Sequence, residues 1–269
     1  MERLCNLFFE LSNEDRLSIL LKLMDEPMKL THIANALALT AQECSRQLSR
    51  LQEIDLVTKN SDGAFMLQPY GRHAFRLFPG FQFLTEHVEY FNRHTLTRLP
   101  EKFMGRVGEL CGCKPVTDLM GTIAKIERIV MEAEEYWLYI SPEPLATAQG
   151  IGKALEVIES GVKCRAVEPL SYRRPEEIER GISQKMRDEI RSLRVGGLLD
   201  NRYMENIDVS IYMSEKEVAL LAFPEVTGQF DYLGFSSTDP KVLEWCRELH
   251  EYYFERAVPW QTHVVYDFP

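Results

Sequence analysis

Hydrophobic residues recur three or four positions apart in two consecutive stretches near the N-terminus. The first stretch contains Leu4, Leu7, Phe8 and Leu11, and the second contains Leu17, Leu20, Leu21 and Met24. This spacing places the apolar side chains on one face, so it predicts two amphipathic helices. Ser12, with Asp15 three residues later, has the pattern of an N-terminal cap for the second helix, and Pro27 predicts its end.

Two further helices and a β-hairpin are predicted next. Residues 31–37 form a short helix, and Thr40 with Glu43 has the capping-box pattern that begins another. The apolar face of that helix consists of Cys44, Leu48 and Leu51. Two short apolar runs follow, at residues 56–59 and 64–67, and they are separated by the turn-forming sequence Asn60-Ser61-Asp62-Gly63.

The predicted order of helix, helix, short turn, helix and hairpin is typical of a winged helix-turn-helix. We therefore predict an α+β winged helix-turn-helix domain over residues 1–78. A small helical domain that binds other proteins is the alternative.

Residues 79–104 are predicted to link this domain to the rest of the chain. After helical residues 69–78, Pro79-Gly80 indicates a kink, and a helix over 81–99 is predicted to end before Pro100. One side of that helix carries Leu84, Val88, Phe91 and Thr95. We expect it to pair with the same helix of a second subunit; the alternative is a linker helix that packs on its own domain.

From residue 105 onward, predicted helices and strands alternate, which indicates a domain of α/β class with a parallel core over 105–269. A single long helix is predicted from Pro175 through Leu193. The other predicted elements are helices around 119–133, 151–158 and 240–253, and strands at 136–140, 162–167, 207–213, 217–223 and 232–236.

Charge and cysteine content limit the functions that this chain can have. It carries 31 Lys and Arg against 41 Asp and Glu, a net charge of −10. Residues 1–78 hold nine Lys and Arg against ten Asp and Glu, so their net charge is only −1. A nearly neutral domain binds DNA only where its few cations are placed locally. Six dispersed cysteines and the absence of a long apolar run favour a cytoplasmic protein that does not enter a membrane.

Several motifs resemble a known family of regulators. In the first domain these are Leu11-Ser12-Asn13-Glu14-Asp15-Arg16-Leu17, Ser45-Arg46-Gln47-Leu48-Ser49-Arg50-Leu51 and Leu67-Gln68-Pro69-Tyr70-Gly71-Arg72. Further on they are His87-Val88-Glu89-Tyr90-Phe91-Asn92-Arg93-His94, Leu99-Pro100-Glu101-Lys102-Phe103, Ala133-Glu134-Glu135-Tyr136, Gly161-Val162-Lys163-Cys164-Arg165 and Asp239-Pro240-Lys241-Val242-Leu243-Glu244-Trp245-Cys246. Together they resemble archaeal regulators that join an ArsR-like winged helix to the Fil-type domain of methanogenesis regulators.

This resemblance implies a dimeric transcription regulator whose second domain senses a signal. The second domain is also similar to the phospholipase D-like fold of TrmB-type regulators. Asp55 departs from the winged-helix pattern, which usually has glycine between recognition helix and wing, but aspartate tolerates the left-handed conformation.

The predicted recognition helix has a polar face suited to reading DNA. Arginine binds guanine, glutamine binds adenine, and serine binds bases or phosphates. Lys59, beside the wing, is suited to a backbone phosphate. The predicted DNA-binding residues are Thr40, Gln42, Ser45, Arg46, Ser49, Arg50 and Lys59. An ordinary solvated helix face is the alternative.

Neither an enzyme nor a cofactor site is predicted. None of the six histidines is followed two positions later by the lysine of a phospholipase D site, and Gly150-Ile151-Gly152-Lys153-Ala154 lacks residues of a phosphate loop. Cys111 and Cys113 resemble the thiol pair of ArsR-type metal sensors, so metal or redox sensing stays an alternative, although no metal ligands are assigned.

An effector site is predicted where the parallel strands end, because loops and helix N-termini converge there. An aromatic ring and two arginines suit a small anionic or sugar-like effector. The predicted residues are Ser141, Glu143, Tyr172, Arg173 and Arg174. We thus expect a dimeric, sequence-specific regulator of transcription that binds double-stranded DNA. A winged-helix adaptor that docks protein is the alternative, and surface arginines paired with nearby glutamates are the alternative to the effector site.

Overall fold

The computed structural model describes residues 1–145 and 147–260, and these form two compact units. The first unit is Met1–Pro79 and the second is Gly80–Pro269, so the chain divides one residue after the predicted boundary. The last nine residues of the predicted second domain, and residue 146 within it, lie outside the described residues. No helix within the described ranges is both long enough and apolar enough to cross a membrane.

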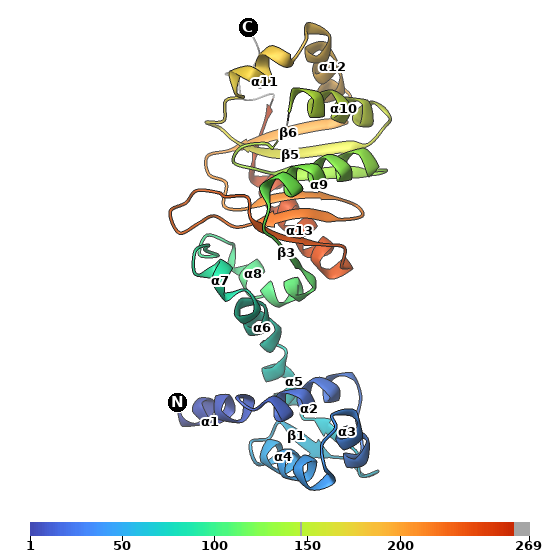
Figure 1. The fold of residues 1–269 in the computed structure, drawn as a ribbon, viewed down its shortest axis with the longest axis vertical. Helices are drawn as coiled ribbons and strands as arrows, with labels where there is room; N and C mark the ends of the chain where they lie inside the picture. The colour runs from blue at the N-terminus through green and yellow to red at the C-terminus, as the bar shows by residue number, and fades with distance from the viewer. Residues whose placement is uncertain (146, 261–269) are drawn as a thin grey trace. The chain divides into compact units, whose positions relative to one another are not determined.

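The first unit contains the predicted helices and hairpin in the predicted order (Figure 1). Its elements are α1 (Glu2–Leu11), α2 (Glu14–Asp25), α3 (Leu30–Ala36), α4 (Ala41–Glu53), β1 (Val57–Lys59), β2 (Phe65–Leu67) and α5 (Pro69–Phe75). The cap predicted for α2 is wrong by one residue. The Asn13 side chain accepts the Arg16 N–H, whereas Ser12 ends α1 and donates its hydroxyl to the Phe9 carbonyl.

The core of the first unit is formed by the apolar faces of its helices and hairpin. The capping box between Thr40 and Glu43 is confirmed at the start of α4, and Cys44, Leu48 and Leu51 are at most 1% exposed. Asp55 has a φ of 61°, which is the left-handed conformation expected at this turn. The apolar periodicity of the sequence therefore predicted the correct inward face of α4.

An eight-stranded sheet forms the centre of the second unit, in the order β10-β6-β5-β4-β7-β8-β9-β3. Only β4, β5 and β6 are parallel neighbours, so the predicted parallel core is confirmed for three strands and the other pairs are antiparallel. The strands are β3 (Lys114–Val116), β4 (Tyr136–Ile140), β5 (Lys163–Pro169), β6 (Leu199–Met204), β7 (Ser210–Ser214), β8 (Val218–Ala222), β9 (Gly234–Ser237) and β10 (Val258–Pro259).

Both faces of this sheet are covered (Figure 1). One face packs against α9 (Leu119–Glu132), α10 (Ala148–Glu159) and α12 (Gln184–Val195), and α11 (Glu176–Gly181) lies near α10. The opposite face packs against α13 (Pro240–Arg256), which begins at the predicted Asp239 cap. Alternate residues of a strand point to opposite faces, so Leu138 and Ile140 contact the α13 side while Trp137 and Tyr139 contact the other.

The long helix predicted over 175–193 is two helices in the structure, α11 and α12. Ser183 caps α12 by accepting the Met186 N–H, and the preceding Ile182 is only 4% exposed. Burial of Ile182 and capping by Ser183 therefore break a sequence that is amphipathic throughout.

The helix predicted over 81–99 is also wrong. The chain instead forms α6 (Phe78–Glu86), α7 (Val88–Phe91), α8 (Glu101–Met104) and the 3-10 helix η1 (Val107–Gly112). Phe83, Leu96 and Phe103 are buried in the same core as α13. Residues 80–104 are therefore part of the second unit's core, and they do not form a separate dimerisation helix.

Gly71 provides a test of how closely α5 packs against the backbone of Leu56 in the first unit. A Cβ built at Gly71 would lie 2.2 Å from the Leu56 carbonyl oxygen, so Gly71→Ala is expected to destabilise the first unit by about 1–3 kcal/mol. At an unobstructed helical position the same change stabilises by up to about 1 kcal/mol, as expected for Gly152→Ala in α10. Hydrogen exchange followed by mass spectrometry measures the local stability of each unit. Stabilisation of residues 1–79 by Gly71→Ala would contradict the packing described.

Candidate functional site

Helix α4 is held in place by a buried polar network in addition to its apolar face. Arg16, which is 8% exposed, donates from Nε to the Glu10 carbonyl oxygen at 2.6 Å and from Nη1 to Gln47 Oε1 at 3.0 Å. Gln47 donates in turn to Asp15 Oδ2 at 3.3 Å. Hydrogen bonds to charged groups in a buried setting fix geometry strongly, so α1, α2 and α4 are joined. Sequence periodicity did not predict this role for Arg16 or Gln47.

Arg50 is placed differently from the prediction. Its guanidinium donates to both carboxylate oxygens of Glu10, at 2.5 and 3.3 Å, and lies 5.8 Å from the Phe9 ring centre. Glu10 is 5% exposed, and its hydrogen bond raises the pKa of Arg50. Arg50 is thus engaged within the first unit, because leaving the buried Glu10 carboxylate would break a charge-assisted pair.

The outward face of α4 presents Gln42, Ser45 and Arg46, all of which are exposed. Ser49 is exposed too, but its hydroxyl donates to the Ser45 carbonyl at 3.0 Å, which leaves its lone pairs for an incoming donor. Thr40 is occupied by the capping box, because its hydroxyl donates to Glu43 Oε2 at 2.7 Å and accepts the Glu43 N–H at 3.2 Å. Gln42, Ser45 and Arg46 are therefore the most accessible predicted readers.

Lys59 adds an exposed cation on the β1–β2 hairpin to the polar face of α4. It is exposed at the end of β1, and its ammonium lies 5.5 Å from the Phe65 ring centre. A cation held over an aromatic ring keeps its charge exposed while its stem is packed. Together with Arg46 and Gln42, it offers the mixture of cationic and amide donors suited to DNA recognition.

A cavity of about 430 Å³ lies in the second unit, between the sheet and the helices α9 to α12. The rings of Trp137, Tyr139 and Tyr212 line it, and they stack successively at centroid distances of 5.2 and 5.6 Å. The size and the mainly apolar lining, with a few aromatic and charged side chains, match those of small-molecule sites.

Of the predicted effector residues, Tyr172, Arg173 and Arg174 line this cavity. Ser141 and Glu143 do not line it, so their assignment is corrected. Ser141 is fully buried and donates to the Glu143 carbonyl at 2.7 Å, and Tyr232 donates to the same oxygen at 3.0 Å. Ser141 and Glu143 therefore shape the loop after β4.

The polar part of the cavity wall is built around Glu168, at the carboxyl end of β5. The Tyr139 hydroxyl donates to Glu168, and Asn201 Nδ2 donates to it at 3.4 Å. Arg194 donates to Asn201 Oδ1 at 3.3 Å. Burial raises the pKa of Glu168, against the lowering effect of the Tyr139 hydrogen bond and of the nearby arginines. Sequence reasoning missed Tyr139, Asn201 and Arg194 because their partners are distant in sequence.

The arginines at the mouth of the cavity are also engaged. Arg174 contacts Glu179 at 3.2 Å, and Arg187 contacts the same carboxylate at 2.5 Å. Arg173 donates to the Tyr172 carbonyl at 2.9 Å. Pairing with glutamate, which was the alternative for these arginines, is thus confirmed for Arg174 and Glu179.

One polar group in the cavity wall lacks a partner. The indole N–H of Trp137 is buried and has no hydrogen-bond acceptor among the described residues. An unsatisfied buried donor costs about 1–3 kcal/mol.

Cys111 and Cys113 do not have the environment of a thiolate pair. Burial raises the pKa of both thiols, that of Cys113 to about 12, so they stay protonated at neutral pH. Across residues 1–145 and 147–260, three potential metal ligands meet only at His94, Glu225 and Asp231. The environment of Cys111 and Cys113 therefore does not support metal or redox sensing by these two thiols.

No family model and no curated protein sequence matches this chain. Among solved structures, it is similar to TrmBL2, described as an archaeal chromatin protein with a novel mode of DNA binding, at 14% identity and a TM-score of 0.42 over 91% of this chain and 93% of that one. It is also similar to Nuc, a phospholipase D family member from Salmonella typhimurium, at 8% identity and a TM-score of 0.38 over 55% of this chain and 97% of that one. Both TM-scores are below 0.5, so neither likeness indicates what this chain does.

The raised pKa of Glu168 predicts a specific pH dependence of stability. The folded chain retains a proton on this carboxyl above the unfolded value of about 4.3, so its contribution to stability falls as pH rises from that value towards the folded pKa. Glu168→Gln removes this fall, so its free energy of unfolding should increase relative to that of the parent between pH 4.5 and 7.5.

Urea unfolding followed by tryptophan fluorescence measures this difference, because Trp137, Trp245 and Trp260 all belong to the second unit. Glu205→Gln, at an exposed carboxyl, is the matched control. A constant difference between Glu168→Gln and parent at every pH would show that Glu168 is not perturbed by burial.

Proposed function

We propose that this chain is a sequence-specific DNA-binding regulator of transcription, in which the first unit acts as a winged helix-turn-helix and α4 as its recognition helix. The observation that carries the proposal is the division of α4 into two faces. Its inner face is fixed by Leu48, Leu51 and the Arg16–Gln47 hydrogen bond, while Gln42, Ser45 and Arg46 are exposed. A reading helix needs a rigid support and a polar outer face that includes arginine.

Charge distribution supports specific rather than general binding to DNA. Residues 1–78 have nearly balanced charge, so their attraction for phosphates in general is weak. Arg46 and Lys59 are cations on the proposed face, whereas Arg50 is paired with Glu10. We therefore expect Arg46 to contact a base and Lys59 a phosphate.

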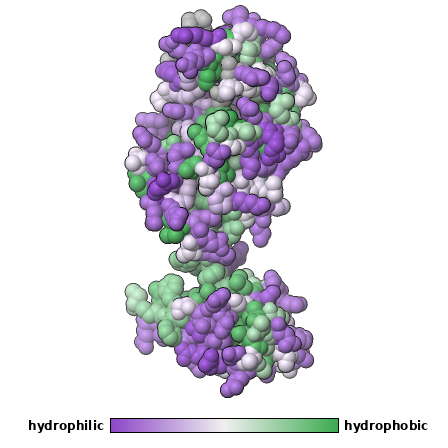
Figure 2. Space-filling view, in the orientation of Figure 1, coloured by the Kyte–Doolittle hydropathy of each residue, from purple (hydrophilic) through white to green (hydrophobic). Residues whose placement is uncertain are grey.

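A second copy of the chain is part of this proposal, because two half-sites one helical turn apart need two reading helices. Residues 81–99 do not form the helix expected to dimerise. Helix α1 instead exposes Leu4, Phe8 and Phe9, which are 47%, 51% and 62% exposed (Figure 2). We propose that this apolar surface of α1 packs against the same surface of the second copy.

The second unit is proposed to bind a small effector in its cavity. The stacked rings of Trp137, Tyr139 and Tyr212 suit a flat ligand. Tyr172 and the arginines beside it line the mouth, where an anionic or polyhydroxylated group of the ligand would lie. For the ligand to change DNA affinity, it must bind better to one of two states of the protein, and DNA must change ligand affinity by the same factor.

The second candidate function is a protein-binding adaptor that uses the same winged helix. The observation that favours it is the net charge of −10, which opposes approach to DNA. An adaptor has no need for Arg46 to discriminate between base sequences, so variants of α4 separate the two functions.

Arg46→Ala is expected to weaken binding to a selected DNA site by about 1–3 kcal/mol while changing binding to random DNA little, because a base contact carries the specificity. Selection of sites from random double-stranded DNA supplies the specific sequence, and fluorescence anisotropy measures both affinities. Arg76→Ala, at the exposed arginine that follows the last residue of α5, is the charge-matched control. Equal losses on selected and random DNA would remove Arg46 from the reading residues, and failure to select any site would favour the adaptor.

Trp137→Ala is expected to weaken binding of the cavity ligand at least about fivefold, because it removes an aromatic ring of the cavity wall, worth about 1 kcal/mol. Ligands are found by thermal-shift screening of metabolites against the full chain, and titration calorimetry gives their affinities. Tyr136→Ala is the control, because the Tyr136 ring is half-buried on the α13 side of the same strand. Equal effects of the two variants would place the ligand outside the cavity.

A further inference from the structure

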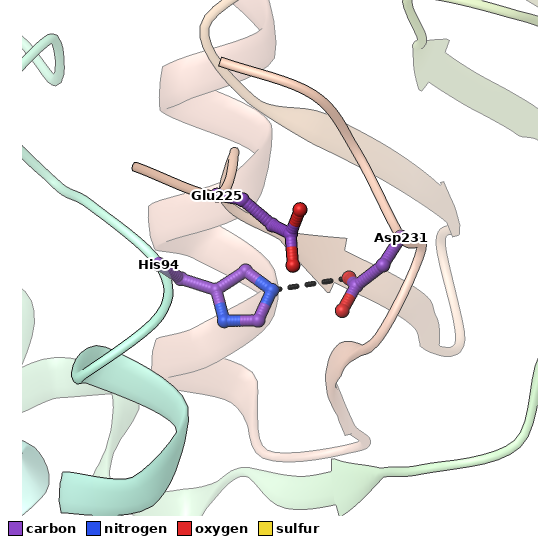
Figure 3. Close-up of side chains that lie close together, drawn as sticks. All are labelled: His94, Glu225 and Asp231. Atoms are coloured by element: carbon purple, nitrogen blue, oxygen red, sulfur yellow. Dashed lines mark hydrogen bonds and ion pairs between the residues drawn. The ribbon is translucent and has the colours of Figure 1, made fainter. Parts of the chain in front are cut away.

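Three side chains that can bind a metal ion come together in the second unit, away from the cavity (Figure 3). His94 follows α7, while Glu225 and Asp231 lie in the loop between β8 and β9. One potential ligand atom of each residue lies within 4.8 Å of those of the other two. Residues from chain segments more than 120 positions apart therefore converge on one point.

The backbone holds these segments together independently of the three side chains. The Thr95 N–H donates to the Pro224 carbonyl at 2.9 Å, and the Val226 N–H donates to the Arg93 carbonyl at 2.8 Å. His94 and Glu225 thereby form an antiparallel bridge. The two residues are positioned before any ion binds, which is what a preorganised site requires.

The His94 ring is fixed from two directions. It is stacked on the Tyr90 ring, with centroids 3.7 Å apart and planes at 3°, and its Nδ1 lies 2.9 Å from the Tyr90 carbonyl oxygen. The Tyr90 hydroxyl accepts the Phe223 N–H at 2.9 Å. A histidine whose Nδ1–H bonds a backbone carbonyl is the common arrangement behind metal-binding Nε2 atoms, because this bond sets the tautomer and the direction of the ring.

The contacts of the two ring nitrogens require a cation between Nε2 and the Asp231 carboxylate. A carbonyl oxygen can only accept, so Nδ1 must carry the proton that lies between them. In a neutral ring Nε2 is then a lone pair, and it faces the Asp231 carboxylate at 3.0 Å. That same Asp231 oxygen already accepts the Leu233 N–H at 3.0 Å. Either a second ring proton or a metal ion must lie between these groups.

We propose that His94, Glu225 and Asp231 bind one divalent transition-metal ion. Glu225 and Asp231 place two carboxylates beside the imidazole, and Arg93 Nη2 lies 3.7 Å from Asp231 Oδ2, so an ion would share this carboxylate with the arginine. Metal–ligand bonds of about 2.1 Å at tetrahedral angles place neighbouring ligand atoms about 3.4 Å apart. The 3.0 Å His94–Asp231 contact would therefore widen by about 0.4 Å, and the Glu225 ligand atom lies within 4.8 Å of the other two. Imidazole with carboxylates suits Zn²⁺ and Mn²⁺, whereas Mg²⁺ prefers oxygen ligands alone.

The burial of the three groups is consistent with entry of an ion from solvent. The His94 side chain is 0% exposed while that of Asp231 is 25% exposed, so the carboxylate side is open. Three protein ligands leave a further coordination position for water. The ion would join the segment after α7 to the β8–β9 loop, and this role does not depend on DNA binding or on the cavity.

Binding of Mn²⁺ to the full chain tests the proposal, because Mn²⁺ avoids the thiols elsewhere in the sequence. After treatment with a chelator and its removal, electron paramagnetic resonance of unbound Mn²⁺ counts the ions bound. We expect one Mn²⁺ per chain, and a Mn²⁺ affinity at least about tenfold lower in Glu225→Gln. Glu225 is partly exposed, so this variant leaves the buried His94–Asp231 contact in place; Glu205→Gln is the exposed control. Zn²⁺ should compete and bind more tightly than Mn²⁺.

Two further results decide the assignment. Asp231→Asn should lower the affinity for Mn²⁺ as Glu225→Gln does. Bound Mn²⁺ should also broaden the nuclear magnetic resonance signals of the His94 ring selectively. If the parent binds neither Mn²⁺ nor Zn²⁺, the cation at Nε2 is a proton and the proposal is wrong. Equal Mn²⁺ affinity in parent and Glu225→Gln, or binding that leaves the His94 signals sharp, would equally overturn it.

Discussion

Burial of both faces of the eight-stranded sheet is the constraint on which the rest of the second unit depends. Strand β4 presents Ile140 to one face and Tyr139 to the other, and both side chains are at most 8% exposed. Helix α13 covers one side together with apolar side chains of residues 80–112, and this segment folds as several short helices in place of the single predicted helix. The helices on the other side leave a cavity whose wall includes the buried polar groups around Glu168. The same packing brings His94 to the β8–β9 loop.

In the first unit, the buried Glu10 carboxylate pairs with Arg16 and Arg50. Arg46, on the outer side of α4, is exposed. Removing one partner from a buried pair leaves an uncompensated charge, so these contacts keep α4 fixed. With a nearly neutral domain, DNA affinity then depends on a few well-placed groups rather than on a broad basic surface.

Local patterns in the sequence were enough to predict the Thr40 capping box, the hairpin after α4 and the strand β4, because each depends on neighbours in the chain. Distant contacts decided what could not be predicted. Strand β6 lacks an alternating apolar pattern because Asn201, the middle of its three buried residues, is polar and bonds Glu168. The ion pair between Arg50 and Glu10 is not predicted by local patterns, because the two residues are 40 positions apart. Ile182 broke a predicted helix because tertiary packing buries it.

The most direct test of the central claim is a salt titration of the full chain on double-stranded DNA that contains a selected site. Each phosphate contact releases counterions, so log K should fall linearly with log salt concentration at about 0.9 per contact. Lys59 of each of two copies is proposed to contact a phosphate, so we expect a slope of about −2 or steeper on the selected site and weak binding to random DNA. A slope near zero, or equal affinity for both DNAs at all salt concentrations, would contradict sequence-specific DNA binding and favour the protein-binding adaptor.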